Sequence, residues 1–229
     1  MRSKSKLPIY EQFHSWQGEG VHQGRSAYFI RSFGCPVHCP WCDSAGTWHP
    51  DYVPKKIQKI SPEDLVKNAL ETKPEFIVIT GGEPCIHNLN ELCERASKAK
   101  IPIHLETSGA FQINGCFDWI TLSPKVWKYP LKENIIKSNE IKIIVDTPIS
   151  IRNWIEKFPE IKNSKHIWLH PEWSKKIDSS ILNTITEWVK NNGNPYRAGY
   201  QVHKLFSADL NDPQSLPDVP LGGNENLGI

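Results

Sequence analysis

The sequence predicts an α/β fold: a partial, incomplete TIM-like barrel with about six parallel strands. Apolar runs typical of buried strands alternate along the chain with helical or irregular crossover segments, which is the pattern of a parallel sheet. The strands follow one another in a single progression, and this fits an open or partial barrel better than a doubly wound sheet. No GxGxxG stretch follows any strand, so the usual dinucleotide fingerprint is missing.

The predicted strands share runs of β-branched, aliphatic and aromatic residues that end at turn formers. The run EFIVIT is continuously apolar, as expected for a strand that is covered on both faces. In chain order the strands are SAYFIRSFG (26–34), EFIVIT (75–80), IPIHLET (101–107), DWITLS (118–123), EIKIIVD (140–146), HIWLHP (166–171) and RAGYQVH (197–203).

Four helices are predicted between these strands. Ser61 is expected to cap the first, because Pro62 follows it and two acidic residues occupy the first turn. The others are NELCERASKA (90–99), IRNWIEKF (151–158) with Ser150 as its cap, and SSILNTITEWVKNNG (179–193), which ends at Gly193. The proline-containing and lysine-rich segment 45–60 is expected to be a loop.

Length and composition suit one sizeable domain, which we place at 1–206, followed by an irregular C-terminal extension, 207–229. The net charge of +2 is too small to indicate nucleic-acid or membrane binding. No apolar run approaches the ~20 residues of a membrane helix, and the N-terminus has no apolar signal region. We therefore expect a cytoplasmic protein whose six cysteines are reduced.

Candidate functional residues follow five of the predicted strands. They are Cys35, Thr80–Gly82, Glu106–Ser108, Ser123–Lys125 and His170–Glu172. The carboxyl ends of parallel strands meet at one face of such a fold, and active sites lie there. The spacing therefore predicts one site that is assembled from several loops.

The stretch GCPVHCPWCDS places Cys35, Cys39 and Cys42 within eight residues. A zinc ion would need a fourth ligand, for which His38 is the local candidate, but no second ligand pair exists elsewhere in the chain. A 4Fe-4S cluster takes one thiolate per iron, so three cysteines would leave one iron open for a substrate or cofactor. By spacing alone a catalytic cluster is favoured, with zinc and unligated thiols as alternatives. Cys93, on a predicted helix, is expected to pack as a small hydrophobe.

The CxxxCxxC motif, with Trp41 before its last cysteine, resembles the signature of radical S-adenosylmethionine enzymes. TGGEP (80–84) resembles the glycine-rich motif of the same superfamily. The stretches SWQGEG, ETSG, SPK and YQVHK then follow the order seen in the 7-carboxy-7-deazaguanine synthase family, and the resemblance extends from about residue 9 to 205.

This resemblance implies a partial barrel with fewer helices than strands. It also implies a homodimer, the usual state in the family. It implies conversion of 6-carboxy-5,6,7,8-tetrahydropterin to 7-carboxy-7-deazaguanine, by hydrogen abstraction, ring contraction and loss of ammonia, on the path to queuosine. Implied cofactors are a 4Fe-4S cluster on three cysteines, S-adenosylmethionine and Mg²⁺. An electron donor such as flavodoxin or ferredoxin is also implied, with no direct contact to nucleic acid or membrane.

The resemblance also assigns residues to the cofactors. Cys35, Cys39 and Cys42 would hold the cluster. Ser44 would hold Mg²⁺, and it stands where the family typically has threonine, retaining the oxygen ligand. His170 stands where relatives carry glutamine. The residues expected around S-adenosylmethionine are Trp41, Cys42, Asp43, Gly81, Gly82, Glu83, Ser108, Ser123, Pro124, Lys125 and His170.

Substrate contacts are expected from the QGEG loop, from the strands that carry Arg31 and Thr80, and from the YQVHK motif. Glu19 and Arg31 are the expected catalytic residues. An arginine buried beside the cysteine loop needs an anion, which the substrate carboxylate would supply. The full set of expected substrate contacts is Trp16, Gln17, Gly18, Glu19, Arg31, Thr80, Gln201 and His203.

Three other interpretations stay open at this point. Another small radical enzyme, such as a glycyl-radical activase, would share the cysteines and GGEP but would not need QGEG, Arg31 or the final QxHK. A zinc-stabilised binding module would bind no S-adenosylmethionine. A degenerate homologue with a structural duty would have no reason to keep all three cysteines.

Overall fold

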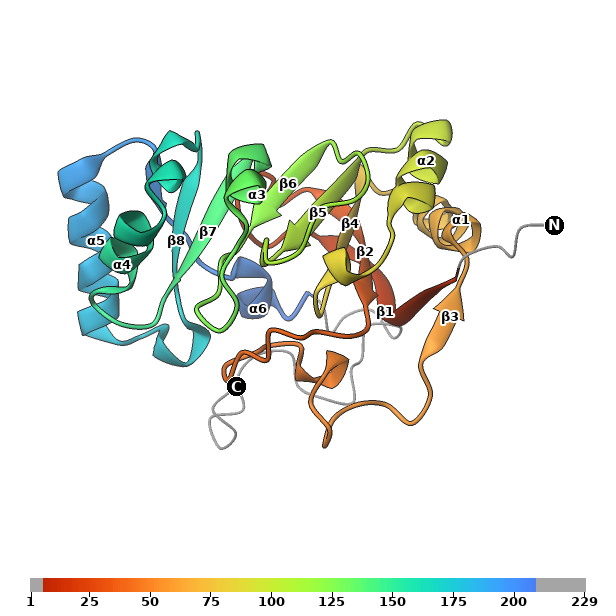
Figure 1. Cartoon of the computed structure of the whole chain (residues 1–229), viewed down its shortest axis with the longest axis horizontal. Helices are drawn as coiled ribbons and strands as arrows, with labels where there is room; N and C mark the ends of the chain where they lie inside the picture. Colours follow the sequence, from red (N-terminus) through yellow and green to blue (C-terminus); the bar gives the residue numbers. More distant parts are fainter. Residues whose placement is uncertain (1–5, 209–229) are drawn as a thin grey trace.

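The computed structural model describes residues 6–208 of the chain. A curved nine-stranded sheet runs through it in the order β3-β1-β2-β4-β5-β6-β7-β8-β9, with β3 and β9 at its two edges (Figure 1). Seven neighbouring strands, β2 and β4 to β9, pair in parallel. The sheet is open, which confirms the predicted parallel α/β architecture of an incomplete barrel.

β1 and β2 are the longest strands, with ten and seven residues, and the edge strands β3 and β9 are the shortest, with three residues each. The bounds of the strands are β1 Leu7–Trp16, β2 Ser26–Ser32, β3 Gln58–Ile60, β4 Phe76–Gly81, β5 Ile103–Thr107, β6 Trp119–Leu122, β7 Glu140–Val145, β8 Ile167–Pro171 and β9 Tyr196–Ala198.

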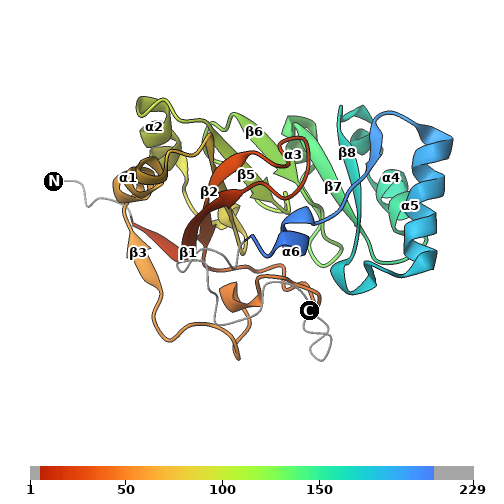
Figure 2. The ribbon, with the colours of Figure 1, turned by 180° about the vertical axis from the view of Figure 1, so that it is seen from behind.

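Five α-helices and four short 3₁₀ turns lie between the described strands, and a sixth helix, α6, follows the last one. Figure 2 shows α6 in front of the sheet, on the side away from α3. The α-helices are α1 Pro62–Thr72, α2 Asn90–Lys98, α3 Lys132–Lys137, α4 Ser150–Lys157, α5 Ser179–Asn192 and α6 Val202–Phe206. The 3₁₀ turns are η1 Ala45–Thr47, η2 Pro84–Ile86, η3 Pro159–Asn163 and η4 Trp173–Lys175.

Two apolar cores join the outer helices to the sheet. One packs α1 and α2 against β1, β2, β4 and β5, and includes Cys93, which is buried as predicted. The other packs α4 and α5 against β6, β7 and β8, with Trp154 among its buried members. Both cores stabilise the strands from outside. The C-terminal strand ends are left to carry polar loops.

The predicted caps are largely confirmed. The Ser61 hydroxyl accepts a hydrogen bond from the backbone N–H of Asp64, 3.1 Å away, so α1 begins as expected. Gly193 follows α5 with a positive φ of 60°. Ser150 is not the cap of α4, because Ile149 holds that position. The Ser150 hydroxyl accepts instead from the Thr147 N–H.

Four elements differ from the prediction. β1 was not predicted, although Leu7, Ile9 and Phe13 are buried at alternate positions along it. β3 lies within the expected loop 45–60, and α3 was also missed. The expected strand 197–203 is wrong over most of its length, since β9 ends at Ala198 and α6 begins at Val202. The N–H of Val202 donates to Gly18 O, so this segment joins the β1–β2 loop and not the sheet.

No helix among the described residues is long and apolar enough to span a membrane. Most of the predicted extension, from residue 209 onward, lies outside the described part of the chain.

Candidate active site

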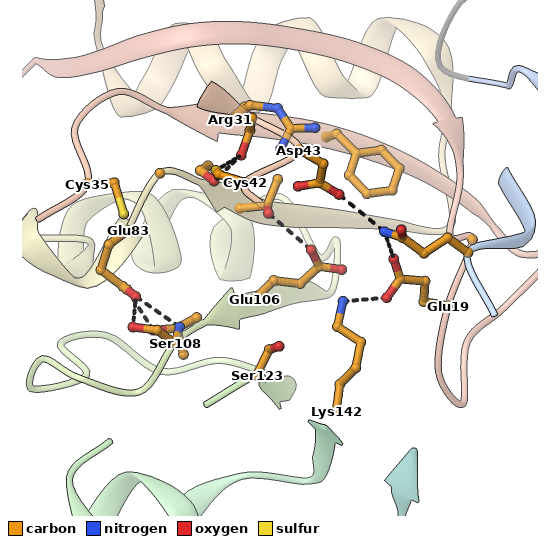
Figure 3. Close-up of a pocket in the computed structure, with 18 of the residues that line it drawn as sticks. Glu19, Arg31, Cys35, Cys42, Asp43, Glu83, Glu106, Ser108, Ser123 and Lys142 are labelled. Atoms are coloured by element: carbon orange, nitrogen blue, oxygen red, sulfur yellow. Dashed lines mark hydrogen bonds and ion pairs between the residues drawn. The ribbon is translucent and has the colours of Figure 1, made fainter. Parts of the chain in front are cut away.

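A cleft opens at the C-terminal ends of β2, β4, β5 and β6 (Figure 3). Its empty space, including the open mouth, amounts to about 1130 Å³. The cleft brings together all but two of the predicted site residues. Those that line it are Trp16, Gln17, Gly18, Glu19, Arg31, Cys35, Cys39, Trp41, Cys42, Asp43, Ser44, Thr80, Gly81, Gly82, Glu83, Ser108, Ser123, Lys125, Gln201 and His203.

Pro124 and His170 are the two that do not line it. His170 is fully buried behind the cleft wall, with Nδ1 3.9 Å from the Glu19 carboxylate. Burial lowers its pKa to about 4, so the imidazole is neutral near pH 7. The expected cofactor contact of His170 therefore stays a prediction to which this geometry adds no support.

The three cysteines leave the sheet directly after β2. Gly34 makes the turn with a φ of 99°, and its N–H donates to Thr47 O. Burial raises the pKa of the Cys39 thiol to about 12, and burial also raises the pKa values of Cys35 and Cys42. Thiolates at these positions need a cationic partner, which a metal cluster supplies.

The cysteine loop does not form a ready tetrahedral zinc site. Within residues 6–208, no three His, Cys, Asp or Glu side chains converge closely enough to hold one metal ion. His38, the expected fourth zinc ligand, is exposed and stacks on Trp48 with ring centroids 4.4 Å apart. Because that lack of convergence includes the three cysteines, the preference for a cluster rests on the donor types alone: three thiols on one loop, with His38 stacked on Trp48.

The glycine loop at the end of β4 packs directly on the cysteine loop. A Cβ at Gly82 would lie 2.7 Å from the carbonyl carbon of Gly34 and 2.9 Å from Cys35 Cβ. Gly81 has a φ of 147°, and a Cβ there would collide with the Ser32 backbone. These two glycines leave bare backbone at the cleft floor, which is the cradle that a cofactor's small polar groups require.

Glu83 fastens the glycine loop to the end of β5. Its carboxylate accepts hydrogen bonds from Thr107 Oγ1 at 2.6 Å, from the N–H of Ser108 at 2.9 Å and from the Ser108 hydroxyl. The N–H of Cys85 donates to the same carboxylate. Glu83 is therefore an organiser of two cofactor-facing loops, with its oxygens already engaged.

The loop after β6 closes the cysteine side of the cleft. Lys125 donates through Nζ to the Ser123 carbonyl at 2.7 Å and to the Ser123 hydroxyl at 2.6 Å. The Lys125 ammonium also lies 5.6 Å from the centre of the Trp41 ring. Burial lowers the pKa of Lys125, while the nearby cysteines oppose that shift.

Ser44 lies where the cysteine and glycine loops meet. Its buried hydroxyl donates to Gly81 O at 3.3 Å and lies 3.7 Å from Cys42 Sγ. An oxygen donor at this junction is of the kind that Mg²⁺ prefers.

The opposite wall of the cleft carries a buried ion pair. Glu19, from the β1–β2 loop, pairs with Lys142 in the middle of β7, and their side chains are 10% and 15% exposed. Burial alone would raise the pKa of Glu19, but Lys142, His170 and His203 hold it well below its usual range. Glu19 is therefore ionised near neutral pH and is fixed at the cleft surface.

Gln201 connects this pair to the cysteine loop. Its side-chain amide donates to Glu19 at 2.9 Å and to Asp43 at 3.2 Å. Lys204, one turn further along α6, lies 3.4 Å from the same Asp43 oxygen. Burial would raise the pKa of Asp43, but Lys204 and Arg31 lower it well below its ordinary value. Two carboxylates from different loops are thus joined by one short helix.

Arg31 already has an anionic partner within the protein. Its Nε donates to Glu11 Oε1 at 2.6 Å, and both side chains are largely buried. The expectation that a buried arginine here depends on substrate for its anion is therefore wrong. Arg31 still lines the cleft, so its guanidinium is held in place by β1 before any ligand binds.

Sequence reasoning missed Lys142 and Lys204 and did not assign Glu106 a contact. Glu106 accepts from Gln17 Nε2 at 2.8 Å and from Thr80 Oγ1 at 3.0 Å, which joins three predicted elements. Lys142 had a usable signal, since it interrupts the apolar strand EIKIIVD. A lysine inside a buried parallel strand requires a carboxylate partner.

Comparison with known proteins agrees with this geometry. The profile of the Radical SAM superfamily matches residues 29–112, which include the cysteine and glycine loops. Membership implies a 4Fe-4S cluster and S-adenosylmethionine as cofactors and a small-molecule substrate. The site's three thiols and glycine-lined floor fit both cofactors.

Close relatives carry one name. A 7-carboxy-7-deazaguanine synthase from Synechocystis sp. is 41% identical over 205 residues, covering 87% of this chain and 92% of the relative. The protein of that name from Escherichia coli K12 is 34% identical over 225 residues, covering 88% and 99%.

A solved structure shows the same fold. The crystal structure of QueE from Escherichia coli superposes with a TM-score of 0.73 at 32% identity, covering 86% of this chain and 95% of that one. The chain therefore belongs to the 7-carboxy-7-deazaguanine synthase family of radical S-adenosylmethionine enzymes.

Proposed function

We propose that this protein converts 6-carboxy-5,6,7,8-tetrahydropterin to 7-carboxy-7-deazaguanine with release of ammonia, in the cytoplasm and on the path to queuosine. The observation that carries the proposal is the convergence of two different walls on one cleft. The cysteine and glycine loops form one wall, and Gln17, Glu19 and Arg31 form the other. A glycyl-radical activase would have no need for the second wall.

The first wall fits the cofactors. Cys35, Cys39 and Cys42 would hold the cluster, and bound S-adenosylmethionine would then supply radical hydrogen abstraction. The bare backbone of Gly81 and Gly82 would admit the methionine end of the cofactor. The remaining contacts on this wall would come from Trp41, Asp43, Glu83, Ser108, Ser123 and Lys125.

The second wall fits a pterin carboxylate. Arg31, already oriented by Glu11, would bind the substrate carboxylate with its remaining guanidinium donors. Glu19 is held ionised by Lys142 and would accept from the donor edge of the pterin ring. Trp16, Gln17, Gly18, Thr80, Gln201 and His203 would complete the contacts.

Gly18 leaves room for the imidazole of His203. A Cβ at Gly18 would lie 2.6 Å from His203 Cβ, so α6 packs directly on the loop. We further propose that Ser44 would help to hold Mg²⁺, which would supply positive charge for the substrate carboxylate. A homodimer and a flavodoxin- or ferredoxin-like donor complete the proposal.

The test is anaerobic reconstitution with iron and sulfide, followed by S-adenosylmethionine, a reductant, Mg²⁺ and the tetrahydropterin. The expected product is 7-carboxy-7-deazaguanine, detected by mass spectrometry with one ammonia released per product. Formation of 5′-deoxyadenosine without any deazapurine would preserve radical chemistry and reject the substrate. An unchanged reaction rate after Mg²⁺ is replaced by a chelator would reject the proposed role of Mg²⁺.

A further inference from the structure

Glu140, the first residue of β7, carries a buried carboxylate that is not among the residues lining the cleft. Only 3% of the residue is exposed. Side chains alternate along a strand, so Glu140 lies on the same face of β7 as Lys142, while Ile141 faces the outer apolar core. A carboxylate enclosed on the inner face of the sheet needs hydrogen-bond donors, and the identity of those donors indicates its role.

Three donors from three different segments converge on the Glu140 carboxylate. The Thr121 hydroxyl of β6 donates to Oε1 at 2.7 Å, and the indole Nε1 of Trp168 in β8 donates to Oε2 at 3.1 Å. These two bonds stay within the sheet. The third donor is the backbone N–H of Val21, 2.9 Å from Oε2, and Val21 belongs to the β1–β2 loop. Glu140 therefore joins that loop to the inner face of the sheet.

The β1–β2 loop lies directly against this carboxylate. Gly20 has a φ of 72°, and a Cβ there would lie 2.4 Å from Oε1 and 2.8 Å from Oε2 of Glu140. The last glycine of the QGEG stretch is therefore required for the close approach of loop and carboxylate. Two further backbone bonds, from Gln17 N to Arg25 O and from Gly24 N to Gln17 O, close the loop on itself and do not fasten it to the sheet.

Glu140 and Lys142 hold the same short segment in two different ways. Lys142 pairs with the side chain of Glu19, toward which it points in Figure 3, and Glu140 accepts from the backbone two residues further on. A binding group is useful only in its exact place, so the backbone that carries it must be held as well as its charge. We propose that Glu140 is a positioning residue for Glu19, which it serves by fixing the β1–β2 loop through the Val21 N–H. The consequence for tetrahydropterin binding rests on the proposed function.

The test compares Glu140→Leu with Glu140→Gln. Leucine occupies a similar volume and offers no acceptor. Glutamine keeps one oxygen for the donors at Oε2, while its amide faces the Thr121 hydroxyl, which can turn and accept. Both changes remove the charge, so the pair isolates the hydrogen bonds. Four quantities are measured on each reconstituted protein: backbone hydrogen exchange over 17–25, the Kd for the tetrahydropterin, the Kd for S-adenosylmethionine, and iron per chain.

We expect Glu140→Leu to exchange the backbone hydrogens of 17–25 about tenfold faster and to bind the tetrahydropterin about tenfold more weakly, because the loop loses its acceptor on the sheet. Its iron content and its Kd for S-adenosylmethionine should stay within about twofold of the parent values, since the cysteine and glycine loops do not contact Glu140. Glu140→Gln should remain within about threefold of the parent in all four measurements.

A second pair of variants leaves Glu140 in place and applies even if Glu140→Leu does not fold. Gly20→Ala and Gly24→Ala both add a methyl group at a positive φ, 72° and 85°, within the same loop. The methyl group at Gly20 meets the Glu140 carboxylate, whereas nothing lies within 4 Å of the one at Gly24. Gly20→Ala should weaken tetrahydropterin binding about tenfold, and Gly24→Ala should change it less than about threefold.

Three results would overturn the inference. The first is unchanged exchange over 17–25, or an unchanged Kd for the tetrahydropterin, in both Glu140→Leu and Gly20→Ala. The second is an equal loss in Glu140→Gln and Glu140→Leu, which would assign the effect to charge. The third is a parallel loss of iron, S-adenosylmethionine and tetrahydropterin binding, which would make Glu140 a general structural residue. A parent protein that does not bind the tetrahydropterin would instead reject the proposed function, and the exchange data would still show whether Glu140 holds the loop.

Discussion

The two walls of the cleft are stabilised by different kinds of interaction. On the cofactor wall, which the cysteine and glycine loops form, backbone lies against backbone, because Gly81 and Gly82 leave no space for any side chain. On the substrate wall, charged side chains from the β1–β2 loop, β7 and α6 are held by their neighbours, as in the Glu19–Lys142 pair. The first wall therefore tolerates no added volume, and the second tolerates no unpaired charge.

The largest effect is expected on the cofactor wall. Gly82→Ala would place a methyl group against the Gly34 backbone, and overpacking of this kind costs about 1–3 kcal/mol. Because the cysteine loop would be displaced, reconstituted iron per chain should fall to near background. Gly24→Ala is the control, since nothing lies within 4 Å of a Cβ there and only its φ of 85° opposes the change. Full iron content in Gly82→Ala would contradict this account.

The next effect is on the substrate wall. Lys142→Met leaves Glu19 buried and unpaired, which should reduce the free energy of unfolding by about 3 kcal/mol at pH 7. Lys190→Met is the matched control. It breaks an ion pair whose side chains are 64% and 57% exposed, and it should cost under about 0.5 kcal/mol. Urea denaturation of both variants measures the difference.

The loss of stability in Lys142→Met should depend on pH in a definite direction. In the parent protein Lys142 depresses the pKa of Glu19, so the pair stabilises the fold above the ordinary carboxylate pKa and loses that contribution only as pH falls through the depressed value. Without Lys142, burial raises the pKa and the neutral acid is favoured. The stability gap between parent and Lys142→Met should thus be wider at pH 7 than at pH 4.5. A gap that does not narrow on acidification would mean that Glu19 is not the group left unpaired.

A smaller effect is expected from Gln201→Ala. This change removes a neutral bridge between Glu19 and Asp43, worth about 1 kcal/mol. The KM for the tetrahydropterin should rise about tenfold or less with little change in iron content. The exposed Gln58→Ala serves as control. A loss of iron in Gln201→Ala would show that the two walls are not separable.

The smallest effect lies outside both walls. Ser61→Ala removes the N-cap of α1 and should lower the free energy of unfolding by about 1 kcal/mol. Its kcat and KM should equal those of the parent protein, measured at a temperature where both are folded. A change in KM would mean that α1 influences the cleft through the sheet.

The sequence locates residues on both walls, but it does not reveal the partners that hold the charged side chains of the substrate wall. Cysteine spacing and paired glycines are local signals, so Cys35, Cys39, Cys42 and the 80–84 loop could be located without a structure. The partners on the substrate wall are far apart in sequence, as Glu19 and Lys142 are, and only the topology brings them together.

The errors in the predicted secondary structure also arise from contacts between residues that are far apart in the sequence. The segment 197–203 reads as a strand locally, yet the N–H of Val202 donates to Gly18 O and the segment turns into α6. In β1, Glu11 occupies an inward position among apolar neighbours, where it pairs with Arg31. Tertiary contacts decide both cases, and they outweigh local propensity.

The central claim is that the two walls bind different ligands independently. The direct measurement compares Gly82→Ala with the double variant Glu19→Gln, Lys142→Met, which removes the buried pair together and leaves neither charge alone. Iron content and the Kd for the tetrahydropterin are measured on both. We predict that Gly82→Ala loses iron, and that the double variant keeps its iron and loses pterin binding. Loss of iron in both variants would contradict the account.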